Sequence, residues 1–137
     1  MFIWCLSHNS LSTRMNVKRK GVELDTRYPM CNRADEDGGH LFLKCKQVKS
    51  VWHNLQVEDI RCSLLSAPDA LSVFEMVEAL PSPKRELVLI LMWDWWTARN
   101  KKNAEGKECI SGSICHRIQR HAIEFCTFYW EHPLGIC

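Results

Sequence analysis

The chain has 137 residues, a length that suits one domain or one small domain with an appendage. Its 46% hydrophobic content and six tryptophans exclude a disordered chain, because large aromatic side chains supply much buried surface per residue. The net charge of +2 supports no argument from overall charge, but the charge is unevenly distributed. Residues 1–55 carry nine Lys and Arg against five Asp and Glu, whereas the remainder carries nine against eleven. The first part therefore favours a nucleic-acid partner.

The eight cysteines can be interpreted only once a compartment is inferred. Residues 1–6 contain no basic residue, and their apolar run is too short for a signal peptide. The longest later apolar run, residues 87–93, is far shorter than a membrane span. We therefore expect an intracellular chain without a membrane partner, in the nucleus or the cytoplasm. Its reduced thiols are then expected to ligate metal or to be buried, and not to form disulfides.

The first elements are predicted from capping residues and turn formers. A short helix is expected over residues 2–7, and a second helix follows Ser12 or Thr13, either of which is a good N-cap. Gly21 is expected to end that second helix. Residues 25–39 are polar and rich in turn formers, so we expect a loop that ends at a pair of glycines.

Helical periodicity dominates the rest of the chain. Apolar residues recur at helical spacing over 40–55 and 69–80, and a loop is expected at 63–66. A Pro-Ser-Pro segment ends the second of these helices. Residues 84–103 predict a further helix that is apolar nearly all round and therefore buried. A last amphipathic helix is indicated by a stripe of apolar residues: Ile114, Ile118, Ala122, Phe125 and Tyr129.

One segment has a metal-binding pattern, Cys-x8-His-x4-Cys, formed by Cys31, His40 and Cys45. Thiolate and imidazole are soft ligands that suit zinc, and a tight loop can bring distant ligands together. The two glycines before His40 favour a sharp turn into a helix that holds His40 in its first turn. A structural zinc site has four protein ligands. The expected fourth position, three residues before Cys31, holds Tyr28, whose phenol pKa of about 10 makes it a poor ligand.

Substitutes for the missing ligand are conceivable, namely a water molecule or one of five side chains: Asp25, Asp35, Glu36, His53 and Cys62. Three ligands plus water is also the arrangement of a catalytic zinc, but no nearby residue is placed as a general base. No nucleophile motif is present either, so we expect no enzyme. Five other cysteines and two histidines lack metal-binding spacing and are expected to be structural: Cys62, Cys109, Cys115, His116, His121, Cys126 and Cys137.

Several short segments share a pattern with a known family: Phe2-Ile3-Trp4, His8-Asn9-Ser10-Leu11-Ser12-Thr13-Arg14, Arg19-Lys20-Gly21, Tyr28-Pro29-Met30-Cys31, Glu36-Asp37, His40-Leu41-Phe42-Leu43-Lys44-Cys45 and Val51-Trp52. The stretch that they span resembles the zinc-binding domain beyond the reverse transcriptase of plant LINE-type (non-LTR) retrotransposons. A later segment is similar to the region that follows this domain in such polyproteins: Trp93-Asp94-Trp95-Trp96-Thr97-Ala98-Arg99-Asn100.

The resemblance implies a zinc cofactor held by ligands of the types Cys, Cys, His and Cys. Cys31, His40 and Cys45 match the last three positions, whereas Tyr28 occupies the first. The chain thus resembles a truncated member with one ligand position changed. The resemblance also implies a reverse transcriptase or another retroelement protein as a partner. The polymerase and the endonuclease lie outside the chain, so no catalytic residue is implied.

The predicted fold is mainly α, with a small zinc-knuckle-like loop between short helices and additional helices after it. Residues 1–55 are expected to form the compact domain that holds this loop. Residues 56–83 are expected to be a helix and a proline-containing linker. Residues 84–137 are expected to be a helical tail that packs less well.

Six basic residues are candidates for contacts with nucleic acid: Lys18, Arg19, Lys20, Lys44, Lys46 and Lys49. Such phosphate contacts would position RNA or DNA without reading its sequence, and the alternative is a solvated helix face. The acidic run at residues 35–37 is expected to favour the N-terminus of the helix that follows. Five tryptophans are expected in the core: Trp4, Trp52, Trp93, Trp95 and Trp96. The alternative for the cluster of Trp93, Trp95 and Trp96 is that it stacks bases.

The predicted function is a retroelement-derived, non-catalytic zinc-binding module that helps to hold RNA or DNA near a reverse transcriptase. In a weaker form of this prediction, the chain is a degenerate remnant of such a module. The competing interpretation is a metal-free helical fragment with a structural or protein-interaction role and no nucleic-acid partner. The oligomeric state has no signature in the sequence.

Overall fold

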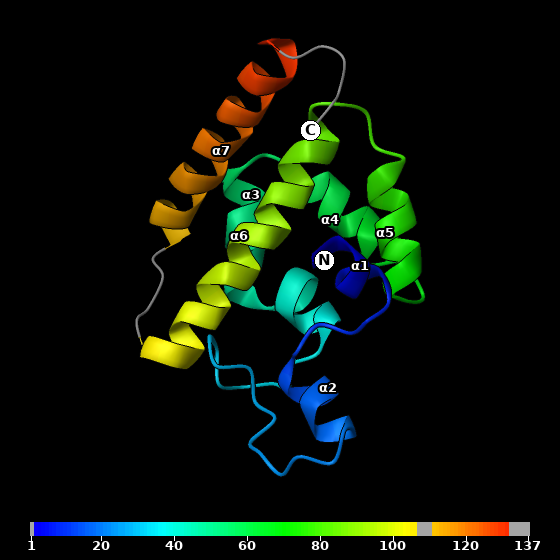
Figure 1. Cartoon of the computed structure of the whole chain (residues 1–137), viewed down its shortest axis with the longest axis vertical. Helices are drawn as coiled ribbons and strands as arrows, with labels where there is room; N and C mark the ends of the chain where they lie inside the picture. The colour runs from blue at the N-terminus through cyan, green and yellow to red at the C-terminus, as the bar shows by residue number, and fades with distance from the viewer. Residues whose placement is uncertain (1, 107–110, 132–137) are drawn as a thin grey trace.

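The computed structural model describes residues 2–106 and 111–131, with the side chains of residues 113–125 in the second range. The regular elements of these ranges are helices: α1 Phe2–Ser7, α2 Arg14–Arg19, the π-helix η1 His40–Lys44, α3 Lys46–Asn54, α4 Glu58–Leu64, α5 Ala70–Glu78, α6 Lys84–Glu105 and α7 Ser111–Glu131. The described residues form no strand, and an isolated bridge joins Arg27 to Asp35. The expected mainly α fold, with a loop between short helices, is therefore confirmed (Figure 1).

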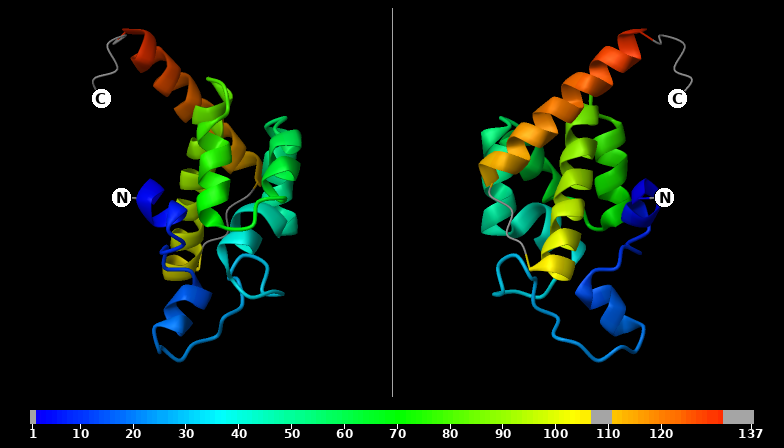
Figure 2. Two further views of the ribbon diagram at one scale, coloured as in Figure 1. Left: turned by 90° about the vertical axis from the view of Figure 1, so that its right-hand side faces the viewer. Right: turned by 60° about the vertical axis from the view of Figure 1, so that its left-hand side comes forward.

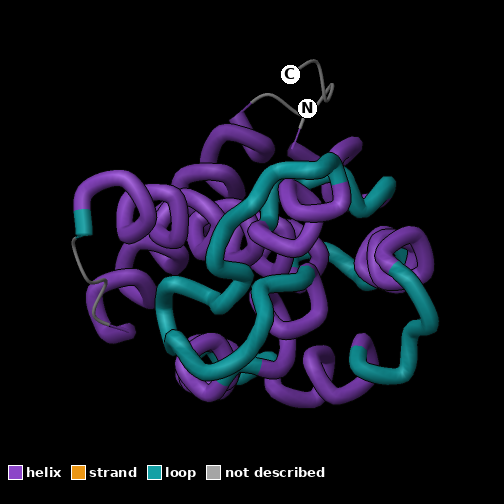
Figure 3. Tube along the Cα trace, turned by 90° about the horizontal axis from the view of Figure 1, so that it is seen from below, coloured by secondary structure: helices purple, strands orange, loops and turns teal. Residues whose placement is uncertain are grey.

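The long helix α6 lies in the middle of the molecule and packs against α7 and α5 (Figures 1 and 2). Helix α3 also packs against α7, and it contacts η1 and α4 as well. The loop between α2 and η1 lies across one end of the helices, as Figure 3 shows from below. None of the helices in the described ranges combines the length and the apolar character that crossing a bilayer requires.

The buried core draws on all three predicted segments of the chain. Its fully buried side chains include Trp52 of α3, Leu64 of α4, Trp95 of α6 and Ile118 of α7. The division into a compact domain, a linker and a tail stays a prediction. The hydrophobic core nevertheless crosses both of the predicted boundaries.

Local capping chemistry places several helix ends where the sequence predicts them. Thr13 is the N-cap of α2, and its hydroxyl accepts a hydrogen bond from the Asn16 amide at 3.2 Å. Gly21 follows the end of this helix at φ +93°, a conformation that suits glycine. Asp69 caps α5 by accepting from the Ser72 amide at 2.8 Å.

One predicted loop is wrong at its start. The loop expected at 63–66 overlaps the last turn of α4, which continues to Leu64. Leu64 is 2% exposed, and its burial in the core favours continuation of the helix to this residue, although the nearby serines locally favour a loop.

The tryptophans divide between the core and the surface. Trp52, Trp95 and Trp96 are buried as expected, whereas Trp4 is 58% exposed and Trp93 is 49% exposed, so core burial was wrong for these two. On α6 the buried side chains recur at 92, 95, 96 and 99, which is the spacing of one helix face. Trp93 points away from that face and contacts Phe2 edge-on at 5.1 Å between ring centroids.

Candidate metal centre

A tight turn presents Cys31. The amide of Tyr28 donates to the carbonyl oxygen of Ala34 at 2.7 Å, and the Tyr28 carbonyl accepts from the Asn32 amide at 2.7 Å. Asn32 has φ +54°, a left-handed conformation that asparagine tolerates better than most residues. The backbone therefore closes on itself around Cys31 through its own hydrogen bonds.

His40 begins the short helix η1, and the Asp37 side chain caps the N-terminus of this helix. The Asp37 carboxylate accepts from the His40 amide at 2.7 Å, which confirms that the acidic run supports the following helix. Gly39 has φ −64° and ψ −47°, so the two glycines enter the helix in a right-handed conformation and not through the sharp turn that the sequence suggested. The Cys45 amide then donates to the His40 carbonyl at 3.0 Å, which places Cys45 one wide turn beyond His40.

The three predicted ligands converge. The Cys31 Sγ lies 3.2 Å from the His40 Nε2, and the ligand atoms of Cys31, His40 and Cys45 all lie within 4.8 Å of one another. Zinc–sulfur and zinc–nitrogen bond lengths with tetrahedral angles would separate a sulfur from a nitrogen by about 3.6 Å. Cys45 is 1% exposed, whereas Cys31 and His40 are half-buried. The donor set and its spacing therefore fit one zinc ion that is approached from the Cys31 and His40 side.

Burial keeps two of these ligands neutral. It raises the pKa of the Cys45 thiol, and the neighbouring Cys31 thiol raises it further. Burial also lowers the pKa of His40, which keeps the imidazole in the uncharged form that binds metal. Zinc binding would consequently release the thiol protons.

Tyr28 fills the side of the cluster where a fourth ligand was expected. Its side chain is fully buried, and its ring meets the His40 imidazole edge-on, with 5.5 Å between the ring centroids. Its hydroxyl is buried and has no hydrogen-bond partner among the described residues. Burial raises the pKa of this phenol far above its ordinary value, and the Cys45 thiol raises it further. A phenolate ligand is therefore disfavoured, and the protein provides three ligands.

The substitute side chains conceivable in the sequence do not join the cluster. Among the described residues, the group able to share one ion consists of Cys31, His40 and Cys45. Four of the five substitutes have other hydrogen-bond partners: Asp25 with Arg27, Asp35 with Thr26, Glu36 with Arg99, and Cys62 with Glu58. Water remains as the fourth ligand that the sequence left open.

A buried ion pair fixes the loop next to this cluster. Arg99 of α6 donates from Nε to a Glu36 carboxylate oxygen at 2.8 Å and from Nη2 to the other oxygen. Glu36 also accepts from the Arg14 amide at 2.8 Å, and Arg99 stacks over the Trp96 ring at 4.9 Å. Glu36 is fully buried, and Arg99 is 5% exposed. The ion pair therefore ties the metal loop, α2 and α6 together.

Side chains from three other helices hold η1 in place. Three successive carbonyl oxygens of η1, those of Leu41, Phe42 and Leu43, each accept a side-chain hydrogen bond. The donors are the Trp95 indole at 2.9 Å, the Trp52 indole at 2.8 Å and the Arg61 guanidinium at 2.8 Å. From the sequence, Trp52 and Trp95 were expected in the core, but neither these bonds nor the role of Arg61 was predictable. No local pattern identifies donors that lie up to 54 residues away.

The six basic candidates lie on α2, η1 and α3 or directly beside them. Arg19 of α2 and Lys44 of η1 line a common groove, which Lys18 and Lys20 do not line although they are exposed on α2 and just beyond it. Lys46 and Lys49 are exposed on α3 and lie outside this groove. The structure thus brings together two of the six residues.

The fold and the cluster define a small helical protein with a Cys-His-Cys group that could hold a metal ion. Residues 1–52 match the family described as "zinc-binding in reverse transcriptase". The matched range includes Cys31, His40 and Cys45 but ends before Arg61, Trp95 and Arg99. No curated protein and no solved structure matched the chain. The family match and the converging ligands point to a zinc-binding module of retroelement type.

Proposed function

We propose that this chain is a non-catalytic zinc-binding module of a retroelement, which assists nucleic-acid binding near a reverse transcriptase. The observation that carries the proposal is the convergence of Cys31, His40 and Cys45 inside the range that matches the reverse-transcriptase zinc-binding family. RNA and DNA are both candidate partners, and the reverse transcriptase or another retroelement protein is the proposed protein partner.

Zinc would act here as a structural cross-link between the Cys31 turn and η1. Cys31, His40 and Cys45 would hold it, with water as the fourth ligand. Two thiolates and one imidazole suit zinc better than the hard cations Mg²⁺ and Ca²⁺. Because Tyr28 contributes no ligand, we expect weaker zinc binding than at a site with four protein ligands.

We further propose an origin in a plant LINE-type retrotransposon, with one ligand position changed and a truncated chain. The support is the resemblance of residues 2–52 and 93–100 to that family and to the region after its zinc-binding domain. Under this proposal Tyr28 replaces an ancestral cysteine, and the chain is a partly degenerate remnant.

The proposed role is not enzymatic, although a zinc ion with an open position can be catalytic. A hydrolytic site would need a carboxylate or imidazole free to act as a general base. The carboxylates nearest in sequence to His40 are engaged, because Asp37 caps η1 and Glu36 pairs with Arg99. We therefore expect no hydrolysis when zinc is added.

A zinc titration of the reduced protein, followed by the release of thiol protons and by metal analysis, tests the metal role. We expect one zinc per chain in the protein and none in Cys31→Ser. Cys62→Ser is the matched control, because Cys62 is exposed and lies outside the cluster. Equal metal content in Cys31→Ser and the unaltered protein would favour the competing interpretation of a metal-free helical fragment.

The nucleic-acid role needs a separate measurement. Binding to single-stranded RNA at several salt concentrations should weaken as salt rises, because phosphate contacts release counterions. Affinity that is undetectable at low salt would contradict this part of the proposal and leave the zinc assignment intact.

A further inference from the structure

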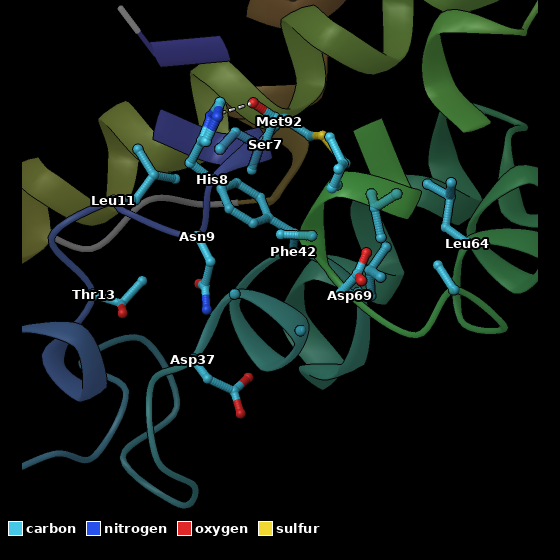
Figure 4. A pocket seen from close by; sticks show the side chains of 18 of the residues that line it. Ser7, His8, Asn9, Leu11, Thr13, Asp37, Phe42, Leu64, Asp69 and Met92 are labelled. Carbon is cyan, nitrogen blue, oxygen red and sulfur yellow. Dashed lines mark hydrogen bonds between the residues drawn. The ribbon is translucent and has the colours of Figure 1, made fainter. Parts of the chain in front are cut away.

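A groove of about 550 Å³ opens beside η1 (Figure 4). Its walls come from α1, the segment after α1, η1 and the connection between α4 and α5. Figure 4 shows Asn9, Thr13 and Asp37 around one part of the groove and Phe42, Leu64 and Asp69 around another. Its size lies in the range of sites that enclose a small molecule or one part of a larger ligand.

Two basic and two acidic side chains line this groove. Arg19 and Lys44 line it and are both exposed, whereas the acidic lining residues are Asp37 and Asp69. Each of these carboxylates caps a helix: Asp37 accepts from the His40 amide at 2.7 Å, and Asp69 from the Ser72 amide at 2.8 Å. Both carboxylates are thus directed at backbone amides of helix N-termini, where negative charge is favourable. Arg19 and Lys44 are the exposed lining side chains that could meet an anionic ligand.

An exposed aromatic pair lies at the rim of the groove. His8 lines the groove, and the Trp4 indole stacks on its imidazole at 4.3 Å between centroids and 22° between planes. The His8 Nδ1 donates to the Trp4 carbonyl at 2.9 Å, which holds the imidazole against the indole. Trp4 is 58% exposed, so one face of the pair is open to a ligand. Solvent-exposed stacked rings offer a surface on which a further flat ring can stack.

From these observations we infer that the groove binds single-stranded nucleic acid, with Arg19 and Lys44 on phosphates and the Trp4–His8 pair under a base. Basic side chains beside exposed aromatic rings are the combination used by proteins that bind single strands. The inference rests on the proposed function and assigns its nucleic-acid contact to one face of the molecule. It leaves Lys46 and Lys49 of α3 outside the contact.

The decisive experiment compares two double variants with the same change in charge. Arg19→Gln with Lys44→Gln removes the groove cations, and Lys46→Gln with Lys49→Gln removes two exposed cations elsewhere. Binding of fluorescein-labelled oligouridylate and oligothymidylate of about 12 nucleotides is measured by anisotropy against salt, a length within the usual site sizes of single-strand binders. The groove variant should lower the slope of log K against log salt by about 1.4, at about 0.7 per lost phosphate contact. The α3 variant should leave the slope unchanged.

A second pair of variants tests the stacking surface. Trp4→Ala should weaken binding at least about fivefold, the lower end of the effect of losing one base–aromatic stack, while the salt slope stays the same. Trp93→Ala is the control, because Trp93 is also about half exposed but does not line the groove or contact His8. Far-ultraviolet circular dichroism of each variant checks that the helices remain folded.

The outcomes separate the groove from the general nucleic-acid role. A loss of slope in the α3 variant, or equal losses in both double variants, would overturn the groove assignment while nucleic-acid binding stands. Failure of the unaltered zinc-loaded protein to bind either oligonucleotide at low salt would overturn both. Affinity for the oligonucleotides that resists the groove variant and persists in high salt would show that phosphate contacts of Arg19 and Lys44 do not support binding, and would likewise contradict the inference.

Discussion

Two neighbouring regions of this protein differ in how completely the fold specifies them. In the metal cluster, Cys31 and His40 are half-buried and Cys45 is buried. The expected position of the fourth ligand is occupied by Tyr28, whose phenol cannot readily act as a ligand. Directly behind the cluster, the Glu36–Arg99 ion pair is buried, and its charged groups have several partners. The frame around the loop is thus complete, while the ligand set is not.

This difference suggests how a metal ligand can be lost without loss of the fold. Many small zinc domains need the ion to fold, because they bury too little apolar surface without it. Here Tyr28 is fully buried against the cluster, and η1 is held by side chains from α3, α4 and α6. The frame should therefore persist without zinc, and the two regions should respond differently to substitution.

The largest effect on stability is expected from Arg99→Met. The substitution leaves the Glu36 carboxylate buried without its ionic partner, which typically lowers the free energy of unfolding by about 3–5 kcal/mol. Urea denaturation of the metal-free protein measures this loss. The double variant with Glu36→Met should recover much of it, because no unpaired charge then remains. A single-variant loss below about 1 kcal/mol would show that the frame does not depend on this ion pair.

Tyr28→Cys should have opposite effects on the two regions, because it should lower stability without zinc and raise the affinity for zinc. Without zinc it removes a buried aromatic ring and should lower the free energy of unfolding by about 3 kcal/mol. With zinc, a third thiolate should tighten binding, and the bound metal should restore stability by mass action. Zinc affinity and urea denaturation with and without zinc measure both effects. Unchanged zinc affinity would mean that position 28 is not the fourth corner of the site.

Trp95→Phe isolates one of the contacts that hold η1. It keeps most of the buried ring but removes the donor to the Leu41 carbonyl, so the loss should be about 1–2 kcal/mol. Thermal denaturation measures it, and Trp93→Phe is the matched control on the same helix at an exposed position. Equal shifts in the two melting temperatures would argue against a role for the indole hydrogen bond.

Cys31→Ser should have the smallest effect on stability. Cys31 is only partly buried, so in the absence of zinc the free energy of unfolding should change by less than about 0.5 kcal/mol. Zinc binding, in contrast, should be lost. Chelation followed by denaturation gives the same comparison without a substitution. A metal-free protein that unfolds on chelation would show that the frame and the cluster are not independent.

Much of the fold and the core of the site could be predicted from local patterns. Thr13 and Asp69 were predictable as helix N-termini because capping depends on residues three positions apart. Cys31, His40 and Cys45 were predictable as a cluster because ligand chemistry and a short loop restrict where such residues can lie. The sequence by itself therefore determined the helical class, several helix boundaries and the three residues of the candidate metal site.

Only the tertiary structure decided which distant residues support the site and which face it presents. Glu36 meets Arg99 across 63 residues, and the Leu41 carbonyl meets Trp95 across 54. Trp4 and Trp93 lie at the surface because the docking of α1 and α6 buries other faces of these helices. Helical periodicity fixes which residues share a face, but not which element that face packs against. That choice depends on how all the helices pack together, and it also determines which basic residues share a groove.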